Sequence, residues 1–368
     1  MTEPAGMKPQ RRACYYGDYL MLDRVLSAQA PESARMGRMA HDEMLFIITH
    51  QAYELWFKQV LHEMDRIQSD FSETPLDDRS LSRAAKGLER IRDILKFVIG
   101  QLDILETMTP LDFLEFRDIL FPASGFQSTQ FRLIEIRLGL KRETRIALDE
   151  KPYESRLQGA DRDAVMLAES QASLFNQLEA WLSRTPFLTQ GDFRFRDAYR
   201  KAVVAMLEAD LAYLEGPGAA ADSREADARA LEKALTRFQA IFEPDSAPGA
   251  WRMTPQAVEG ALFITLYRDE PALQTPFRVL SALMDIDEAM TLWRYRHALM
   301  VQRMIGVKLG TGGSSGHDYL AATAKAHRIF GDLFQLSTYL IPRSALPTLP
   351  QETARRMGLV YASEGARP

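Results

Sequence analysis

Two histidines stand among apolar neighbours, where their chemistry could be put to use. His297 shares a helical stripe with Ile, Met and Trp residues, and His50 follows Phe46 by four residues, so it faces the same way. A histidine in such a place is most often a hydrogen-bonded core residue. A neutral imidazole projecting from a rigid helix into an apolar slot is also what a haem iron requires. The residues alone leave both interpretations open.

Arg117 is the third candidate, and it follows Phe113 by four residues on one helix face. A partly buried guanidinium needs an anion nearby. That anion is either an internal carboxylate, such as Glu115 or Asp118, or the carboxylate of a ligand. Guanidinium binds carboxylate as a bidentate fork, so a free amino acid is a suitable guest.

Other catalytic motifs are missing from the sequence. No H-E-x-x-H, no histidine pair at i, i+4 and no G-x-S-x-G elbow occurs. The glycine-rich run at 310–316 lacks the Lys-Ser/Thr ending of a phosphate loop and follows a predicted helix. The composition of this run fits a flexible loop and a ligand-binding loop equally well.

Composition limits the class of protein. The chain has 368 residues, of which 46% are hydrophobic, enough to bury a large core, and its net charge of −5 argues against nucleic acid as a partner. A single cysteine, Cys14, excludes an intramolecular disulfide and a four-cysteine metal site. No signal peptide and no membrane-spanning apolar run is found, so a cytoplasmic protein without membrane contact is expected.

Helical periodicity dominates the elements that must position these side chains. Apolar residues recur at 3-4 spacing across 88–102 and 285–304, and Thr109 with Pro110 marks a helix start. Residues 42–65 carry two apolar stripes, which predicts a largely buried helix. We therefore expect an all-α fold, a helical bundle of mostly long antiparallel helices. Further helices are predicted at 161–184, 197–215 and 224–242.

The expected organisation is one domain with loose ends. Residues 1–14 are predicted to be a loose N-terminal segment, and 15–349 a single helical domain. That domain includes an additional helical excursion at about 185–250, with 216–222 as its linker. Residues 350–368 are predicted to be a loose tail.

Four long blocks of sequence carry a resemblance to a known family. In chain order they are YYGDYLMLDRVLSAQ from Tyr15, HDEMLFIITHQAYELWFKQ from His41, DFLEFRDILFPASGFQSTQFR from Asp112 and WRYRHALMVQRMIGVKLGTGGSSG from Trp293. They resemble the tryptophan 2,3-dioxygenases, in the family's order, from about residue 16 to 349. The resemblance implies a homotetramer with one haem b per subunit. It also implies the opening of the indole ring of L-tryptophan with O2 to N-formyl-L-kynurenine, the first step of the kynurenine route.

The resemblance also assigns roles to residues around the reaction. His297, in R-Y-R-H, matches the axial ligand of the haem iron, and His50, in I-I-T-H-Q, matches the distal catalytic histidine that binds the indole N–H. Arg117, in E-F-R-D, matches the arginine that pairs with the substrate carboxylate. Thr311, in G-T-G-G, matches the threonine that contacts the ammonium and carboxylate of tryptophan.

The walls of the substrate site follow from the same blocks. Phe46 and Phe113 match the aromatic walls of the indole pocket. Tyr16 and Tyr19, in Y-G-D-Y, match tyrosines that enter the pocket from a neighbouring subunit. The resemblance thus implies an active site that depends on oligomerisation.

Two alternatives accompany this hypothesis. Ala52 and Tyr53 follow the distal histidine where some bacterial members carry Thr-Ser, and a reshaped distal side could suit a related haem monooxygenase that inserts one oxygen atom into tryptophan or a substituted tryptophan. A haem- or tryptophan-binding sensor without turnover is the other. The combined presence of His50, Arg117 and Thr311 argues against the sensor, which has no need of a carboxylate clamp.

Overall fold

The computed structural model describes residues 13–146, 157–215, 224–242, 251–306 and 316–359, and it is all-helical apart from one small β-hairpin. The helices are α1 (Tyr16–Leu20), α2 (Leu22–Val25), α3 (Glu32–Arg35), α4 (Glu43–Ser72), α5 (Asp78–Leu105), α6 (Pro110–Arg117), α7 (Thr129–Leu138), α8 (Gly159–Ser170), α9 (Leu174–Leu182), α10 (Phe195–Glu215), α11 (Arg224–Ala240), α12 (Pro255–Leu266), α13 (Pro271–Ile305), α14 (Gly316–Ala326), α15 (Gly331–Gln335) and α16 (Gln351–Met357). The strands are β1 (Thr189–Gln190) and β2 (Phe193–Arg194). The prediction of an all-α fold is confirmed.

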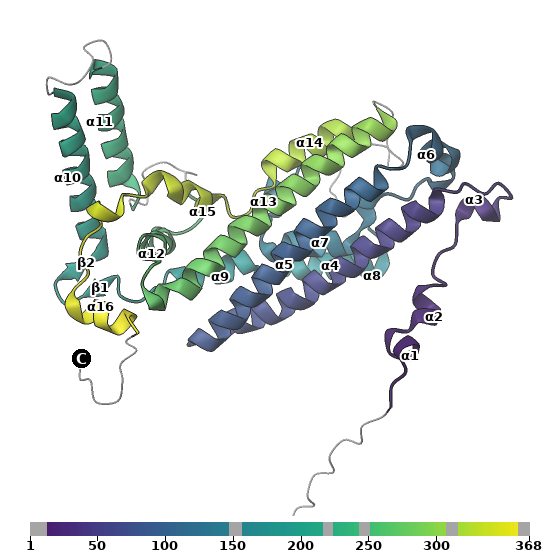
Figure 1. Cartoon of the computed structure of the whole chain (residues 1–368), viewed down its shortest axis with the longest axis horizontal. Helices are drawn as coiled ribbons and strands as arrows, with labels where there is room; N and C mark the ends of the chain where they lie inside the picture. Colours follow the sequence, from purple (N-terminus) through teal and green to yellow (C-terminus); the bar gives the residue numbers. More distant parts are fainter. Residues whose placement is uncertain (1–12, 147–156, 216–223, 243–250, 307–315, 360–368) are drawn as a thin grey trace, which may run out of the picture.

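Three long helices, α4, α5 and α13, run side by side and form the body of the molecule (Figure 1). Asp77 caps the start of α5, because its side chain accepts a hydrogen bond from the Ser80 N–H at 2.7 Å. Its apolar stripe faces α4 and α13 and is buried throughout, as the spacing predicts, at Leu88, Ile91, Leu95, Val98 and Leu102. A helix with a continuous buried stripe is a rigid support for the pocket at its C-terminal end.

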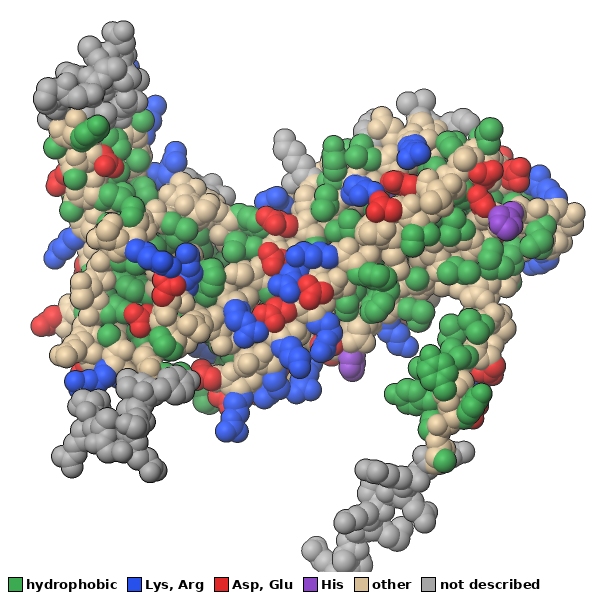
Figure 2. Space-filling view, viewed as in Figure 1, with side chains coloured by type: hydrophobic (Ala, Val, Ile, Leu, Met, Phe, Trp, Pro, Cys, Tyr) green, Lys and Arg blue, Asp and Glu red, His purple; other side chains and the backbone are tan. Residues whose placement is uncertain are grey.

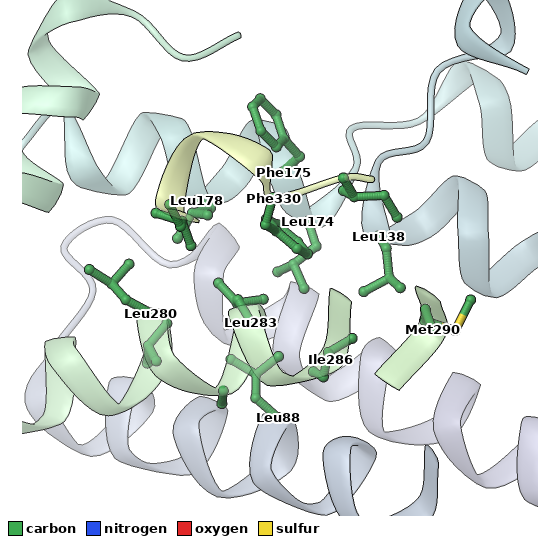
Figure 3. Close-up of a cluster of buried hydrophobic side chains, with 14 of the residues drawn as sticks. Leu88, Leu138, Leu174, Phe175, Leu178, Leu280, Leu283, Ile286, Met290 and Phe330 are labelled. Atoms are coloured by element: carbon green, nitrogen blue, oxygen red, sulfur yellow. The ribbon is translucent and has the colours of Figure 1, made fainter. Parts of the chain in front are cut away.

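The main core lies between this layer and the helices behind it. Figure 3 shows Leu88 of α5 beside Leu283 of α13, with Leu174 of α9 and Phe330 closing the cluster. All four are fully buried. Each such side chain contributes about 1.5–3 kcal/mol through removal of apolar surface from water. The core therefore fixes α13 along most of its length.

The predicted helical stretch 161–184 consists of two helices in the structure. The α8 helix ends at Ser170 and α9 begins at Leu174. Ser173 causes the break, because its hydroxyl accepts from the Asn176 N–H at 3.3 Å while the Asn176 side chain accepts from the Ser173 N–H at 3.1 Å. This reciprocal capping box starts a new helix.

The two ends of the chain differ from the expectation in different ways. Residues 1–12 lie outside the described residues, and the following α1 and α2 form an arm that stands away from the bundle (Figure 1). The expected loose tail after residue 349 instead contains α16, in which Thr353 and Met357 are each 1% exposed. Packing against α13 orders this short helix, a long-range effect that local sequence does not reveal.

The excursion between α9 and α12 leaves the body as a pair of helices. Strands β1 and β2 form an antiparallel hairpin whose turn uses Gly191 at φ 56°. The α10 and α11 helices then pair with each other and extend away from the bundle at the upper left of Figure 1. The predicted linker at 216–222 lies outside the described residues. Among the described helices, none is long and apolar enough to cross a membrane.

Candidate active site

A largely apolar pocket lies among α4, α5, α6, α7 and α13, near the end of the bundle where α6 sits (Figure 1). It encloses about 270 Å³ and is lined by Phe46, His50, Phe113, Arg117 and His297. These five candidates come from three separate blocks of sequence. The structure therefore brings together most of the residues that the sequence singled out.

His50 presents a hydrogen-bond acceptor to the pocket. Its Nδ1 lies 2.7 Å from the carbonyl oxygen of Phe46, one turn earlier on α4. A carbonyl can only accept, so Nδ1 carries the proton and Nε2 keeps its lone pair. Burial by the surrounding protein lowers the pKa of His50, against the opposing effects of the Phe46 hydrogen bond and the Glu54 charge. The imidazole is therefore neutral at pH 7.

His297 lines the same pocket from α13. Burial, and next the nearby His50, lower the pKa of His297 to about 4, so this imidazole is also neutral. Its Nδ1 is buried and has no hydrogen-bond partner among the described residues. The ring is stacked on Trp293, with centroids 5.1 Å apart and planes 15° apart. A neutral, rigidly held imidazole facing an apolar pocket is the donor that an iron porphyrin takes.

Arg117 is placed at the pocket by a well-defined short helix. Thr109 and Asp112 form a capping box at the start of α6, and Pro110 occupies its first turn, as predicted. The Arg117 side chain is 13% exposed and borders the pocket. Asp118 lies 3.7 Å from its Nη1 but is 84% exposed, so this ion pair is largely hydrated. The guanidinium lies at the wall of the pocket, beside Phe113.

Aromatic rings build the wall between these polar groups. Phe46 and Phe113 stack with centroids 5.7 Å apart and planes 28° apart. Phe116 packs edge-on against both, at 5.6 Å from Phe46 and 5.4 Å from Phe113. Such a wall is flat and apolar, which suits an aromatic guest.

Two of the other predicted site residues, Tyr16 and Tyr19, are not brought to the pocket of their own chain. Tyr16 and Tyr19 lie on the N-terminal arm, 71% and 74% exposed, and do not line the pocket of their own chain. Thr311 lies outside the described residues. Its predicted contact with substrate stays a prediction.

Several residues that line the pocket were not predicted as site residues from the sequence. Tyr53 and Phe57 continue the His50 face of α4, and Trp293 precedes His297 by one turn, so helical spacing could have indicated them. Phe131 and Arg132 of α7 had no such signal. They reach the pocket through contacts between distant parts of the chain, such as the one between Phe131 and Trp293, whose ring centroids are 4.8 Å apart.

A second hollow, on the outer face of α4 and α5, lacks comparable chemistry. Trp56 and Phe97 meet edge-on in it, at 5.4 Å between centroids, beside several charged side chains. It is more open to solvent than the pocket of His50 and His297, and no histidine lines it. We therefore place the reaction in the enclosed pocket.

The donor set narrows what metal the pocket could hold. Within the described ranges, no cluster of three or more His, Cys, Asp or Glu side chains could hold a bare metal ion. Most described residues that line the pocket beside His297 are apolar, Met300 and Met304 among them, and such a lining suits a flat macrocycle. Fold and site together define a helical protein with an apolar, aromatic-walled pocket that two histidines and an arginine line.

Comparison with known proteins gives the family. The sequence profile described as tryptophan 2,3-dioxygenase matches residues 2–340. A tryptophan 2,3-dioxygenase of Bdellovibrio bacteriovorus is 49% identical over 94% of this chain and 98% of its own, and one of Dictyostelium discoideum is 43% identical over 96% and 90%. One of Xenopus tropicalis is 42% identical over 93% and 86%. The chain belongs to the tryptophan 2,3-dioxygenase family.

Proposed function

We propose that this chain opens the indole ring of L-tryptophan with O2, using a haem b held by His297, to give N-formyl-L-kynurenine. One observation carries the proposal: two neutral histidines and a guanidinium meet at one aromatic-walled pocket. An iron ligand, an acceptor for an indole N–H and a carboxylate clamp are the three groups that this reaction needs. The membership of the family supports the same reaction.

Haem, when bound, supplies the iron chemistry that activates O2. The chain's own contribution is to bind and orient tryptophan. Arg117 takes the substrate carboxylate as a bidentate fork, and Thr311 takes the ammonium and carboxylate from the glycine-rich segment. Fixing the amino-acid end in this way holds the indole C2–C3 bond at the reacting position and removes an entropy barrier.

The distal side orients the ring. His50 Nε2 accepts a hydrogen bond from the indole N–H, because its Nδ1 proton is committed to the Phe46 carbonyl. The stacked rings of Phe46 and Phe113 hold the flat face of the substrate and exclude water. Tyr53 borders the pocket one turn further on, where burial raises the pKa of its hydroxyl and keeps it neutral.

We propose that the working form is a homotetramer in which the arm of one subunit completes the pocket of another. Apolar side chains are exposed along α4, α5 and α13, a face that is visible in the right half of Figure 2. They include Ile48 and Leu55 of α4, which are 49% and 59% exposed. The prediction that the apolar stripes of residues 42–65 are largely buried is therefore wrong for the stripe that holds these two residues. Exposed apolar faces of this kind mark protein interfaces. Tyr16 and Tyr19 are available on the projecting arm.

The test is the mass of the product. Haem-loaded, reduced protein is mixed with L-tryptophan and labelled O2, and the product is weighed. We expect a gain of two oxygen atoms, both carrying the label. A gain of one atom would identify a monooxygenase, and unchanged tryptophan would identify a binding protein without turnover.

A further inference from the structure

Among the described residues, none accepts a hydrogen bond from the ring of His297. A metal-binding histidine almost always donates its second ring N–H to a fixed acceptor, which sets the plane of the ring. The buried Nδ1 of His297 has no such partner among the described residues. We infer that Trp293 acts as a positioning residue and sets the plane of the His297 imidazole by stacking on it. The inference rests on the proposed function, in which His297 holds the iron.

The geometry of the pair suits this role. The two rings are 5.1 Å apart between centroids and nearly parallel, at 15°. Both come from α13, one turn apart, so the helix backbone itself places them face to face. Rotation of the imidazole about its Cβ–Cγ bond would have to push the indole aside. The indole is held on α7 as well, because its centroid lies 4.8 Å from that of Phe131.

The α7 helix is in turn locked to α13 at the adjacent position. Glu135 follows Phe131 by one turn and accepts a hydrogen bond from Arg294 at 2.7 Å, with the two side chains 1% and 3% exposed. Burial alone would raise the pKa of Glu135, but the guanidiniums of Arg145, Arg132 and Arg294 hold it well below its usual range. The carboxylate is therefore charged, and the pair is stable. On α7, Phe131 therefore holds Trp293, and Glu135 holds the next residue of α13, Arg294.

An aromatic series then connects the two sides of the pocket. Phe131 contacts Phe57, and Phe57 stacks on Tyr53, at centroid distances of 5.5 and 6.2 Å. Tyr53 meets His50 edge-on at 6.3 Å. Since each ring borders the pocket, Trp293 belongs to a wall that also supports the distal histidine. Trp293 contacts His297 directly and His50 only through this series, so we expect a substitution at Trp293 to affect His297 most.

The test uses haem-loaded full-length protein and two substitutions of one residue. Trp293→Leu removes the flat face, whereas Trp293→Phe keeps an aromatic ring there. We expect Trp293→Leu to shift or broaden the iron–histidine stretching band of the ferrous form and to speed haem transfer to apomyoglobin roughly tenfold or more. Trp293→Phe is expected to stay close to wild type in both measurements.

Trp181→Leu is the matched control. Trp181 is a partly buried tryptophan of α9 that packs edge-on against Phe71 at 5.7 Å and does not line the pocket. Its variant should lower the melting temperature without moving the iron–histidine band.

Three outcomes decide the inference. A Trp293→Leu protein with the wild-type band and haem transfer rate overturns it. If that variant does not fold, Phe131→Leu, which frees the other contact of the indole, must broaden the band, and an unaltered band overturns the inference. A wild-type protein that binds haem without any iron–histidine band refutes the proposed function instead, so the two failures are distinguishable.

Discussion

The two pocket histidines are neutral for a shared physical reason, and that reason fixes what each can do. Burial in apolar surroundings disfavours the charged imidazolium in both cases, more than the charge of Glu54 beside His50 can offset. For His297, neutrality leaves a lone pair for iron. For His50, the committed Nδ1 leaves an acceptor for the indole N–H. Protonation would abolish both functions.

Tryptophan binding should therefore depend on pH through His50. Its lowered pKa keeps the acceptor in place down to pH 6.5, the ordinary histidine value, and affinity should fall below that pH as the ring gains a proton. Anaerobic titration of the ferrous protein with tryptophan from pH 5 to 8 measures this. A His50→Leu variant should bind more weakly, and the acid loss should be smaller in it. An equal acid loss in both proteins would contradict the acceptor role.

The Arg117→Lys substitution should weaken tryptophan binding strongly. Lysine keeps the charge but cannot form the bidentate fork, so a charge-assisted hydrogen bond worth about 1.5–3 kcal/mol is lost, or about 10- to 100-fold in Kd. Arg278→Lys is the control, since Arg278 pairs with Glu89 on the surface. Equal tryptophan affinity in Arg117→Lys and wild type would refute the clamp.

At the level of the elements, one close helix contact can be tested by adding a single carbon. Gly260 of α12 packs against the end of α9, and a Cβ there would overlap the carbonyl oxygen of Leu182 and the hydroxyl of Thr185. Gly260→Ala should destabilise the protein by about 1–3 kcal/mol. Gly100→Ala on the exposed side of α5 meets nothing within 4 Å and should stabilise by about 0.5–1 kcal/mol. Chemical unfolding of the two variants should move the midpoint in opposite directions.

Local patterns determine some of these elements and not others. The stripe of α5 and the cap at Thr109 depend on residues close in sequence, so periodicity and capping rules predict them. The break before α9 was missed although the Ser173 cap is local. The α16 helix and the approach of α7 to the pocket depend on packing against α13, which no local pattern records.

The residues of the candidate site also fall into two groups, those that local spacing predicts and those that only the fold brings together. His50 with Phe46, and Arg117 with Phe113, could be paired from helical spacing, and the resemblance supplied their roles. That His297 faces the same pocket is a property of the folded chain. Phe131 and Arg132 end the block of sequence that begins at Asp112, but no helical spacing links them to Arg117, so they were not predicted as pocket residues.

At the scale of the whole molecule, the projecting arm and the exposed apolar face suggest a site shared between subunits. Tyr16 and Tyr19 do not line the pocket of their own chain, which agrees with the proposal that they complete the pocket of a neighbouring subunit. The exposed apolar side chains along α4, α5 and α13 support the same proposal. Oligomerisation would then be part of catalysis.

Replacing both Tyr16 and Tyr19 by Ala should lower turnover about 100-fold, through loss of substrate positioning, and leave haem content unchanged. Tyr213→Ala is the control, because Tyr213 of α10 is 73% exposed and far along the chain from the pocket blocks. Co-expression with His297→Ala subunits should restore activity that neither variant has alone. Failure of every mixed oligomer to regain activity would argue against a shared pocket.

The most direct measurement is haem binding by the purified chain and its histidine variants. Wild type and His50→Ala should each bind one haem per chain with a clear Soret band, because His50 is not the iron ligand. His297→Ala should lose that band or bind haem far more weakly, with a circular dichroism spectrum still helical. A colourless wild type after reconstitution, or a His297→Ala protein with the wild-type Soret band, would contradict the account.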